Sequence, residues 1–253
     1  MSLTLNSYPL QNVDYKNLTN MVDFITVFTT PESNWSSLHH IFLIEDFQKI
    51  VNDYISKGVP KDKLITSISL YGYVFYIQNK SQHSAGAPSF IGPKGPMTGR
   101  KGIWAYYEVC NKMHKPGVSQ SGYQQRNFIP RTTPSFFDGR VWISYDSLNR
   151  IQDKVMWLKM QDVGGYALNT VDADVFMDAL CDFNIYNFPL AEGAYLASLN
   201  LKQFQSLVSS ATTQVPILTP DPLTGFPTMR VVVFWLLAVG VWHLVVNRLT
   251  SDL

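Results

Sequence analysis

The sequence predicts an α/β fold, because stretches typical of buried strands alternate with stretches typical of helices. Residues 24–29 are short, apolar and rich in β-branched or aromatic side chains, and Pro31 follows them. Residues 44–57 carry apolar side chains at helical spacing, and residues 64–73 form a second apolar strand. A strand, a helix and a strand in this order are the βαβ unit of a parallel sheet.

The same alternation returns later in the chain. A helical stripe begins at Leu148 and ends before Gly164 and Gly165, which are residues that terminate helices. Residues 166–171 are another short buried-strand candidate, and residues 187–206 predict one more helix. The second half of the chain therefore continues the α/β pattern of the first.

Composition excludes several classes of protein. The chain has 253 residues, enough for one large domain or two small ones. Its 20 Lys and Arg against 19 Asp and Glu give a net charge of +1, so no overall field exists to hold a nucleic acid. Charged residues make up only 15% and aromatic residues 13%, which leaves many rings for core packing or for stacking on sugars.

The middle of the chain is rich in glycine and proline. They are frequent between residues 86 and 102, where no long helix can form. We predict an inserted, loop-rich subdomain that runs to about residue 146.

The C-terminal part of the sequence predicts a linker and then an apolar helix. Residues 209–228 are rich in Ser, Thr and Pro. Residues 231–247 lie between Arg230 and Arg248, and as a helix they would cover about 25 Å of a hydrocarbon core near 30 Å. We predict a transmembrane helix here, with a buried terminal helix as the alternative.

A series of motifs stands in a fixed order along the chain. They are residues 23–30, Ser69-Leu70-Tyr71-Gly72, Gly86-Ala87-Pro88, Gly92-Pro93-Lys94-Gly95-Pro96, residues 102–110 with Tyr106-Tyr107-Glu108, residues 141–146, residues 154–159, Gly164-Gly165 and residues 171–176. Their types and order resemble the second half of the family 18 glycoside hydrolases, the chitinases and chitinase-like lectins.

This resemblance implies a partial (β/α)8 TIM barrel, about strands six to eight, with an α+β chitinase insertion domain and the C-terminal apolar helix. The sixth and seventh strand units are expected in residues 1–73, and the insertion domain in residues 74–146. Residues 147–206 would form the last barrel helix, strand and helix, residues 207–229 the linker, and residues 230–248 the transmembrane helix. Such a part-barrel leaves two unpaired edges, which predicts aggregation, pairing with another chain or poor accumulation.

The resemblance also implies a disulfide between Cys110 and Cys181, and hence an oxidising compartment. Sequons at Asn17, Asn34 and Asn79 would accept N-glycans there. We predict an extracellular protein, or one anchored in a membrane of the secretory pathway. The first residues contain no signal peptide, and a missing N-terminal part is the simplest way to reconcile the two.

The resemblance implies chemistry that this sequence has lost. Family 18 enzymes cleave β-1,4-linked N-acetylglucosamine with the substrate's acetamido group as nucleophile and one Glu as general acid. Their Asp-x-x-Asp-x-Asp-x-Glu motif is absent here. The sixth strand ends Phe28-Thr29-Thr30-Pro31 instead of Met-Thr-Tyr-Asp, and Asn169 replaces the Trp of the eighth strand. We expect an inactive chitinase-like protein without catalytic residues; the alternatives are a fragment of a longer chitinase and a fragment without function.

Four residues remain as candidates for binding chitin or chitooligosaccharides weakly. Tyr71, Tyr73 and Trp142 could stack on pyranose rings, and Glu108 could accept hydrogen bonds from sugar hydroxyls. Core packing is at least as good an interpretation for Trp142, and the two are balanced for Tyr71 and Glu108. We predict no cofactor and no metal site, because the adjacent pair His39-His40 has no evident third ligand.

Overall fold

The structure is a computed structural model. It describes residues 1–30, 34–41, 43–113, 119–121, 134–176, 187–199, 231–236 and 241–246.

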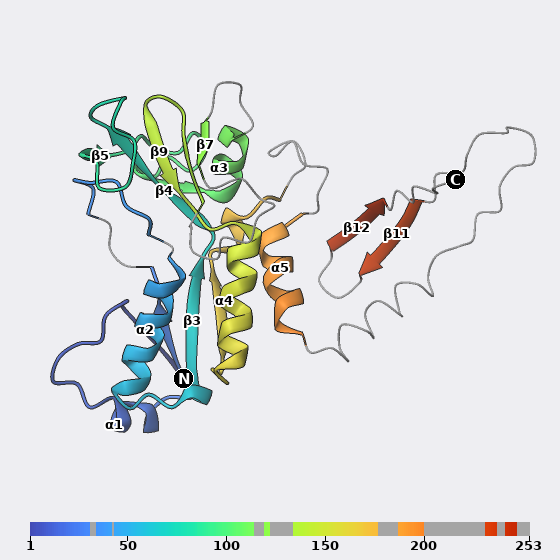
Figure 1. The fold of residues 1–253 in the computed structure, drawn as a ribbon. Coiled ribbons are helices and arrows are strands. Elements are labelled where there is room, and N and C mark those ends of the chain that lie inside the picture. Colours follow the sequence, from blue (N-terminus) through green and yellow to red (C-terminus); the bar gives the residue numbers. More distant parts are fainter. Residues whose placement is uncertain are drawn as a thin grey trace, which may run out of the picture.

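A parallel sheet of four strands forms one half of the molecule (Figure 1). Its strands are β1 (Ser2–Leu5), β2 (Phe24–Phe28), β3 (Leu64–Ser69) and β10 (Gly165–Asn169), in the order β1-β2-β3-β10. All three pairings are parallel. The sequence predicted three of these strands and missed β1, because its four residues alternate polar and apolar side chains over too short a stretch to stand out. The described strands form an open sheet, so the predicted partial barrel is not confirmed.

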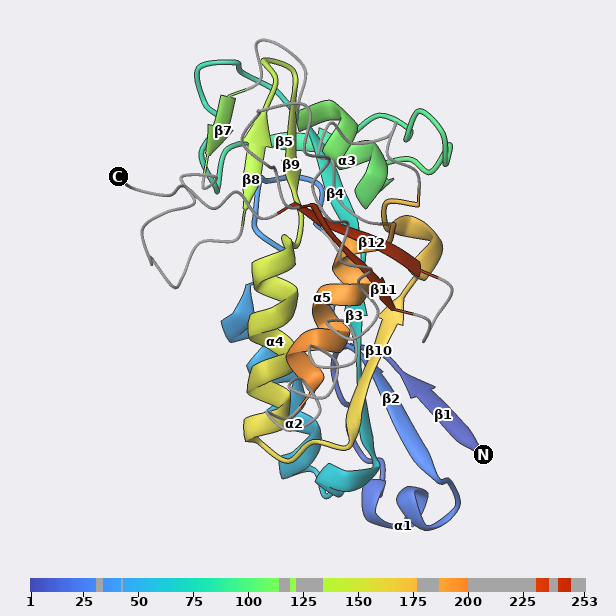
Figure 2. The same cartoon turned by 90° about the vertical axis from the view of Figure 1, so that its right-hand side faces the viewer.

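Helices cover one side of this sheet (Figure 2). They are α2 (Ile44–Ser56), α4 (Leu148–Met160) and α5 (Pro189–Ser198), whereas α1 (Tyr15–Asn20) lies at the end of the sheet where β2 begins. The buried stripe of α2, including Phe47 and Val51, packs in one core with Ile25 and Val27 of β2. The helical spacing read from the sequence therefore predicted the face of α2 that meets the sheet.

The second half of the molecule is an antiparallel sheet with one helix. The strands are β4 (Tyr71–Ile77), β5 (Ser89–Ile91), β6 (Ile103–Ala105), β7 (Ser119–Ser121), β8 (Ser135–Phe137) and β9 (Val141–Ser144), and the helix is α3 (Tyr106–Met113). The single strand predicted over residues 64–73 is wrong, because the chain leaves the parallel sheet at Leu70. There the Leu70 amide donates to the Asn169 carbonyl, and the Leu70 carbonyl accepts from the Tyr106 amide.

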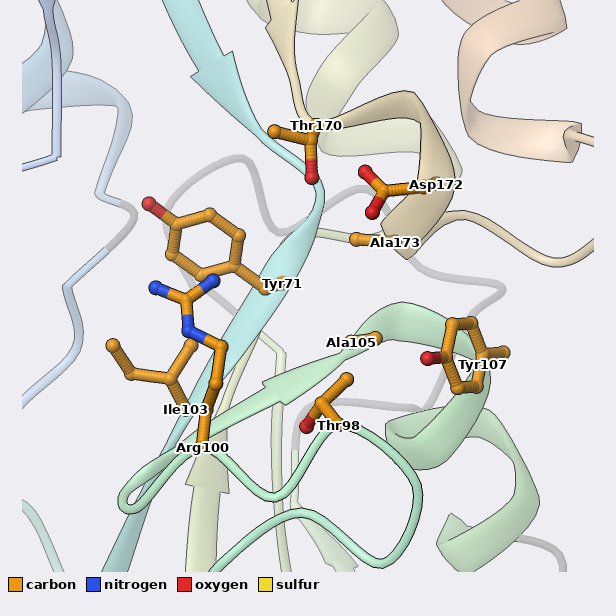
Figure 3. Close-up of a pocket in the computed structure, with 9 residues that line it drawn as sticks. All are labelled: Tyr71, Thr98, Arg100, Ile103, Ala105, Tyr107, Thr170, Asp172 and Ala173. Atoms are coloured by element: carbon orange, nitrogen blue, oxygen red, sulfur yellow. The ribbon is translucent and has the colours of Figure 1, made fainter.

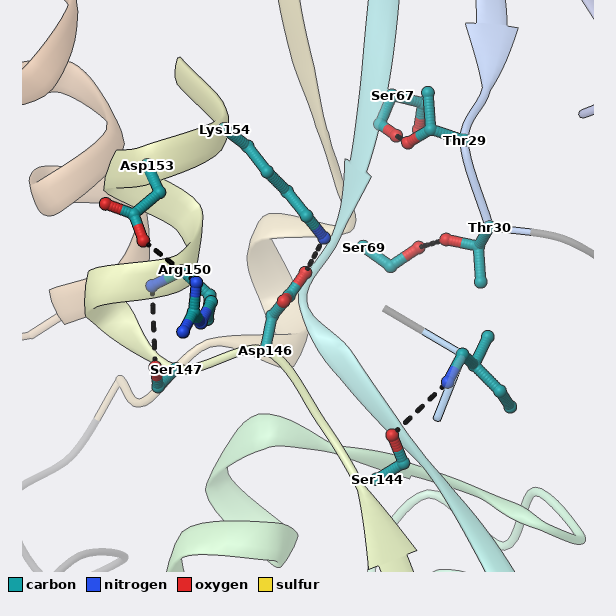
Figure 4. Close-up of polar contacts among 11 residues, drawn as sticks. Thr29, Thr30, Ser67, Ser69, Ser144, Asp146, Ser147, Arg150, Asp153 and Lys154 are labelled. Atoms are coloured by element: carbon teal, nitrogen blue, oxygen red, sulfur yellow. Dashed lines mark hydrogen bonds and ion pairs between the residues drawn. The ribbon is translucent and has the colours of Figure 1, made fainter. Parts of the chain in front are cut away.

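A buried ion pair joins the two halves (Figure 4). Lys154 of α4 donates to Asp146, just beyond β9, at 2.5 Å, and both side chains are buried. Because an unpaired buried charge is costly, this pair fixes the entry of the chain into α4. Ser147 caps the helix by accepting from the Arg150 amide.

The predicted transmembrane helix is wrong. Within residues 230–248 the structure forms two antiparallel strands, β11 (Val231–Leu236) and β12 (Val241–Val246). Both strands are rich in valine, whose branched Cβ favours strand over helix. No helix in the described part of the chain is long and apolar enough to cross a bilayer. The predicted linker, residues 207–229, lies outside the described residues.

Candidate functional site

A pocket lies where the two halves of the molecule meet, at the carboxyl ends of β3 and β10 (Figure 3). It has a volume of about 280 Å³. The residues that line it are Tyr71, Thr98, Arg100, Ile103, Ala105, Tyr107, Thr170, Asp172 and Ala173. Carboxyl ends of parallel strands are where α/β folds place their ligands, because side chains from several strands and loops converge there.

Tyr71 supplies the aromatic face of the pocket. It opens β4 and pairs with Ala105 of β6, another pocket residue. The Arg100 guanidinium lies 5.5 Å from the centroid of the Tyr71 ring (Figure 3), within the range of a cation–π contact. A sugar that stacked on this face of Tyr71 would have to displace the exposed Arg100 side chain or share the ring with it.

Glu108 lies behind the pocket and holds two of its lining residues, Thr98 and Ala105. Its Oε1 accepts from the amides of Met97 and Thr98 at 2.6 and 2.9 Å. Its Oε2 accepts from the Thr98 hydroxyl at 2.9 Å and from the Ala105 amide at 2.8 Å. Four donors use the four acceptor positions of a carboxylate, so Glu108 fixes Thr98 and Ala105 in place. Sugar binding by Glu108 stays a prediction, and it would have to compete with these donors.

Polar groups complete the far side of the pocket. Thr170 and Asp172 follow β10 and are exposed, and Tyr107 opposes them from α3 (Figure 3). Burial, and then the negative charges of Glu108 and Asp172, raise the pKa of the Tyr107 hydroxyl. The Tyr107 hydroxyl is protonated at neutral pH, as in an ordinary tyrosine, and can donate a hydrogen bond.

Hydroxyl groups at the carboxyl ends of β2 and β3 are held by hydrogen bonds between the two strands (Figure 4). Thr29 donates to the Ser67 carbonyl, and the hydroxyls of Thr30 and Ser69 lie 2.6 Å apart. The resemblance implies that Phe28-Thr29-Thr30-Pro31 replaces the family's Met-Thr-Tyr-Asp at the end of this strand. Thr30 then stands in place of the Tyr, which would supply a phenol. Pro31, which stands in place of the Asp, lies outside the described residues.

The structure brings one of the predicted stacking residues to the pocket and leaves two elsewhere. Tyr71 lines the pocket, whereas Tyr73 and Trp142 belong to a buried aromatic cluster with Trp35 and Phe75. Tyr73 is 8% exposed and stacks on Trp35, with 5.6 Å between ring centroids, and Trp142 is 2% exposed. Core packing accounts for both, and a sugar contact by either stays a prediction.

Sequence reasoning missed most of the pocket. Arg100 and Thr98 lie in the glycine-rich segment, where no pattern marked them. Thr170 lies in the strand candidate of residues 166–171 and Asp172 in the motif of residues 171–176, and neither was predicted as a site residue. The signal that could have found them is position, since residues that directly follow a parallel strand lie at its ligand-binding end.

The predicted modification sites lie on the surface as far as they are described. Asn17, Asn34 and Asn79 are all exposed, and their glycosylation stays a prediction. Cys110 is buried in α3, and there is no free cysteine in the described residues. Its predicted partner Cys181 lies outside the described residues, so the pairing stays a prediction.

Fold and pocket together define the class: an α/β protein with its pocket at the carboxyl end of parallel strands, walled by an inserted antiparallel sheet. Within that class, the model of the family "Glycosyl hydrolases family 18" matches residues 3–174. The chain belongs to this family.

Curated relatives support the same family. Mouse chitotriosidase-1 is 28% identical over 171 residues, which cover 67% of this chain and 32% of that protein. Human chitinase-3-like protein 2 is 31% identical over 150 residues, covering 59% of this chain and 36% of that protein. The chain thus spans about a third of the length of these two relatives.

Solved structures show the same fold. A group II chitinase catalytic domain of Ostrinia furnacalis superposes with a TM-score of 0.68 at 21% identity, over 78% of this chain and 54% of that one. Human YKL-39, described as a pseudo-chitinase with retained chitooligosaccharide binding properties, has a TM-score of 0.65 at 22% identity, over 78% of this chain and 57% of that one.

Proposed function

We propose that this chain is a chitinase-like protein that binds chitooligosaccharides in the Tyr71 pocket without hydrolysing them. The observation that carries the proposal is the pocket itself, which joins an aromatic ring with hydroxyl, guanidinium and carboxylate groups at the ligand-binding end of a family 18 fold. Aromatic faces stack on the C–H faces of sugars, and the surrounding polar groups hydrogen-bond sugar hydroxyls.

The absence of hydrolysis follows from the carboxylates around the pocket. Glycosidic cleavage requires a carboxylic acid that gives its proton to the leaving oxygen. Glu108, behind the pocket lining, is held by four donors, and Asp172, the carboxylate that lines the pocket, is exposed. The ends of β2 and β3 present the Thr29 hydroxyl, which donates to the Ser67 carbonyl, and the paired hydroxyls of Thr30 and Ser69, none of which is an acid at neutral pH.

The binding experiment is an isothermal titration of the full chain with N-acetylchitooligosaccharides. Replacing Tyr71 by Ala is expected to weaken binding about tenfold, the effect of losing one stacking contact of roughly 1.4 kcal/mol. The matched control is Tyr76→Ala on the same strand, since Tyr76 is 38% exposed, lies on the opposite face of β4 and does not line the pocket. If no binding is detected at millimolar sugar, or if both variants weaken binding equally, the pocket is not the sugar-binding site.

The competing function is hydrolysis, and the observation in its favour is the likeness to chitinase catalytic domains. The chain covers about a third of the curated relatives, so a longer protein could carry the acid. Release of reducing ends from chitooligosaccharides separates the two. We expect none from this chain, and release that Asp172→Asn abolishes would establish hydrolysis instead.

Both functions fit export from the cell. The exposed Asn17, Asn34 and Asn79 and the absence of a free cysteine among the described residues support an oxidising, extracellular location. Mass spectrometry of the protein secreted by eukaryotic cells tests this directly, because N-glycans at these three positions form only in the secretory pathway.

A further inference from the structure

Arg100 is the basic residue among those that line the pocket. It belongs to a loop, residues 94–101, that is closed by an antiparallel bridge between Lys94 and Lys101. The side chains of these three basic residues are exposed. Within the described part of the chain none of the three forms an ion pair, so no acidic side chain there neutralises their charge.

The loop lies in a basic part of the sequence. Residues 64–107 contain four Lys or Arg and no Asp or Glu, whereas the whole chain has a net charge of only +1. Three of the four basic residues lie in the loop. Glu108, which follows this stretch, lies behind the pocket lining and accepts from four donors. The side of the pocket formed by the loop is therefore locally positive, which favours an anionic ligand.

Backbone hydrogen bonds fix the position of Arg100. The Arg100 carbonyl accepts from the Gly95 amide at 3.0 Å, and the Gly99 amide donates to the Gly95 carbonyl at 3.0 Å. Gly99 has a φ of +66°, a left-handed conformation that glycine adopts without strain. Thr98 is bound to the buried Glu108 carboxylate through its amide and its hydroxyl. The loop therefore holds Arg100 at the pocket before a ligand binds, which lowers the entropy cost of binding.

The two ends of the pocket carry opposite charges. Figure 3 shows Arg100 with Tyr71 at one end, and Tyr107 with Asp172 at the other. An anionic group on a ligand is attracted by the guanidinium at the first end and repelled by the carboxylate at the second. A saccharide with one anionic group would therefore bind in one direction, with its charge at Arg100 and its neutral hydroxyls at Tyr107 and Asp172.

An anionic group also removes the competition for the Tyr71 ring. The Arg100 guanidinium lies 5.5 Å from the centroid of this ring, so a neutral sugar that stacks on the same face must displace the guanidinium or share the ring. A carboxylate or sulfate instead accepts from the N–H groups of the guanidinium, whose planar fork of donors matches two oxygen atoms of an anion. Arg100 then contributes to binding, because it no longer has to leave the ring.

We propose that the Tyr71 pocket prefers anionic saccharides, and that Arg100 determines this preference by binding their carboxylate or sulfate group. The inference rests on the proposed sugar binding and names the class of sugar that the pocket takes. The exposed Lys94 and Lys101 add to the attraction but do not line the pocket.

Isothermal titration of the full chain with matched tetrasaccharides tests the proposal. The probes are N-acetylchitotetraose, the same tetramer sulfated at C6, and the tetramer oxidised to a carboxylate at C6. At low salt we expect the anionic tetramers to bind about fivefold tighter than the neutral one, the effect of an exposed ion pair of about 1 kcal/mol. At about 1 M salt this preference should disappear, because the screening length falls to about 3 Å. A preference for either anion supports the proposal and identifies the group that Arg100 binds.

The variant Arg100→Gln removes the charge and keeps a hydrogen-bonding side chain. It should bring the ratio of the anionic and neutral affinities to about one, since the guanidinium fork is lost. The matched control is Lys101→Gln, which removes the same charge from the next residue, outside the pocket lining. This control should change the ratio by less than about twofold, because an exposed charge that does not contact the ligand is screened by solvent.

The outcomes separate this inference from the proposed function. If the neutral tetramer binds as tightly as both anionic ones at low salt, the preference for anions is wrong, while sugar binding by the pocket stands. If none of the three tetramers binds at millimolar concentration, sugar binding is wrong and the inference fails with it. A preference for anions that Arg100→Gln retains, or that Lys101→Gln removes to the same extent, also overturns the role of Arg100.

Discussion

Glu108 is the residue whose chemistry differs most from what its motif suggested. In a Tyr-Tyr-Glu run that resembles a cleft-lining motif, it was a candidate sugar acceptor. The fold instead surrounds its carboxylate with the amides of Met97, Thr98 and Ala105 and the Thr98 hydroxyl. Hydrogen bonds to a buried charged group are among the stronger ones in proteins, so the residue holds the pocket wall together.

We therefore expect Glu108→Ala to lower the free energy of unfolding by about 2–4 kcal/mol, because four donors lose their acceptor at a buried site. Urea denaturation measures the change. Glu45→Ala is the control, since Glu45 is an exposed glutamate of α2, and it should change stability by less than about 0.5 kcal/mol. If the two variants lower the free energy of unfolding equally, the hydrogen bonds of the Glu108 carboxylate contribute little to stability.

Among the elements, the junction of α4 and β10 depends on a close backbone approach. Gly164 donates its amide to the Lys61 carbonyl at 2.7 Å, which places β10 beside the short helix η1 (Lys61–Lys63) that leads into β3. A Cβ at position 164 would lie 2.2 Å from the Asp62 carbonyl oxygen, a backbone atom. The sequence predicted Gly164-Gly165 as a helix stop, and packing gives the first glycine a further role.

Replacing Gly164 by Ala should therefore destabilise the protein by about 1–3 kcal/mol, the usual effect of overpacking. Its neighbour provides the control. A Cβ at Gly165 would meet only the end of the flexible Ile65 side chain, at 3.2 Å, so Gly165→Ala should be well tolerated. Thermal unfolding of both variants decides the point, and a Gly164→Ala protein as stable as the wild type would contradict it.

At the scale of the whole molecule, two carboxyl groups around α5 make stability depend on pH. Burial raises the pKa of Asp174 to about 6, although the amides of Ala191, Val175 and Leu190 oppose the shift. Burial also raises the pKa of Glu192 to about 7. Both groups hold their proton to a higher pH in the folded protein than in the unfolded chain, so the folded state loses stability as they ionise.

The contribution of these two groups is therefore fully present below about pH 4 and is lost as pH rises through about 6 and 7. Urea titrations between pH 4 and 8 should show the free energy of unfolding falling over this window. In Glu192→Gln, which cannot ionise, the fall should be shallower. A variant with the same slope as the wild type would show that Glu192 does not titrate in this range.

The strands and helices that could be predicted are those that bury one face, so that the order of apolar residues within the element itself shows the pattern. Val27 and Ile25 alternate with half-exposed neighbours, and the apolar stripe of α2 repeats at helical spacing, so each element carries its own pattern. The four residues of β1 also alternate, but over too short a stretch to identify a strand, and β1 depends on pairing with β2. The valine-rich C-terminus was misread because apolar character alone does not separate a helix from a hairpin.

The sequence by itself determined the α/β class and the family, because these depend on residue types and their order. Only the tertiary structure decided which side chains face the pocket. Tyr71 lies there while Trp142 is buried in the antiparallel sheet, and Arg100 reaches the Tyr71 ring from a loop. These placements depend on contacts between segments far apart in the chain, which no local pattern records.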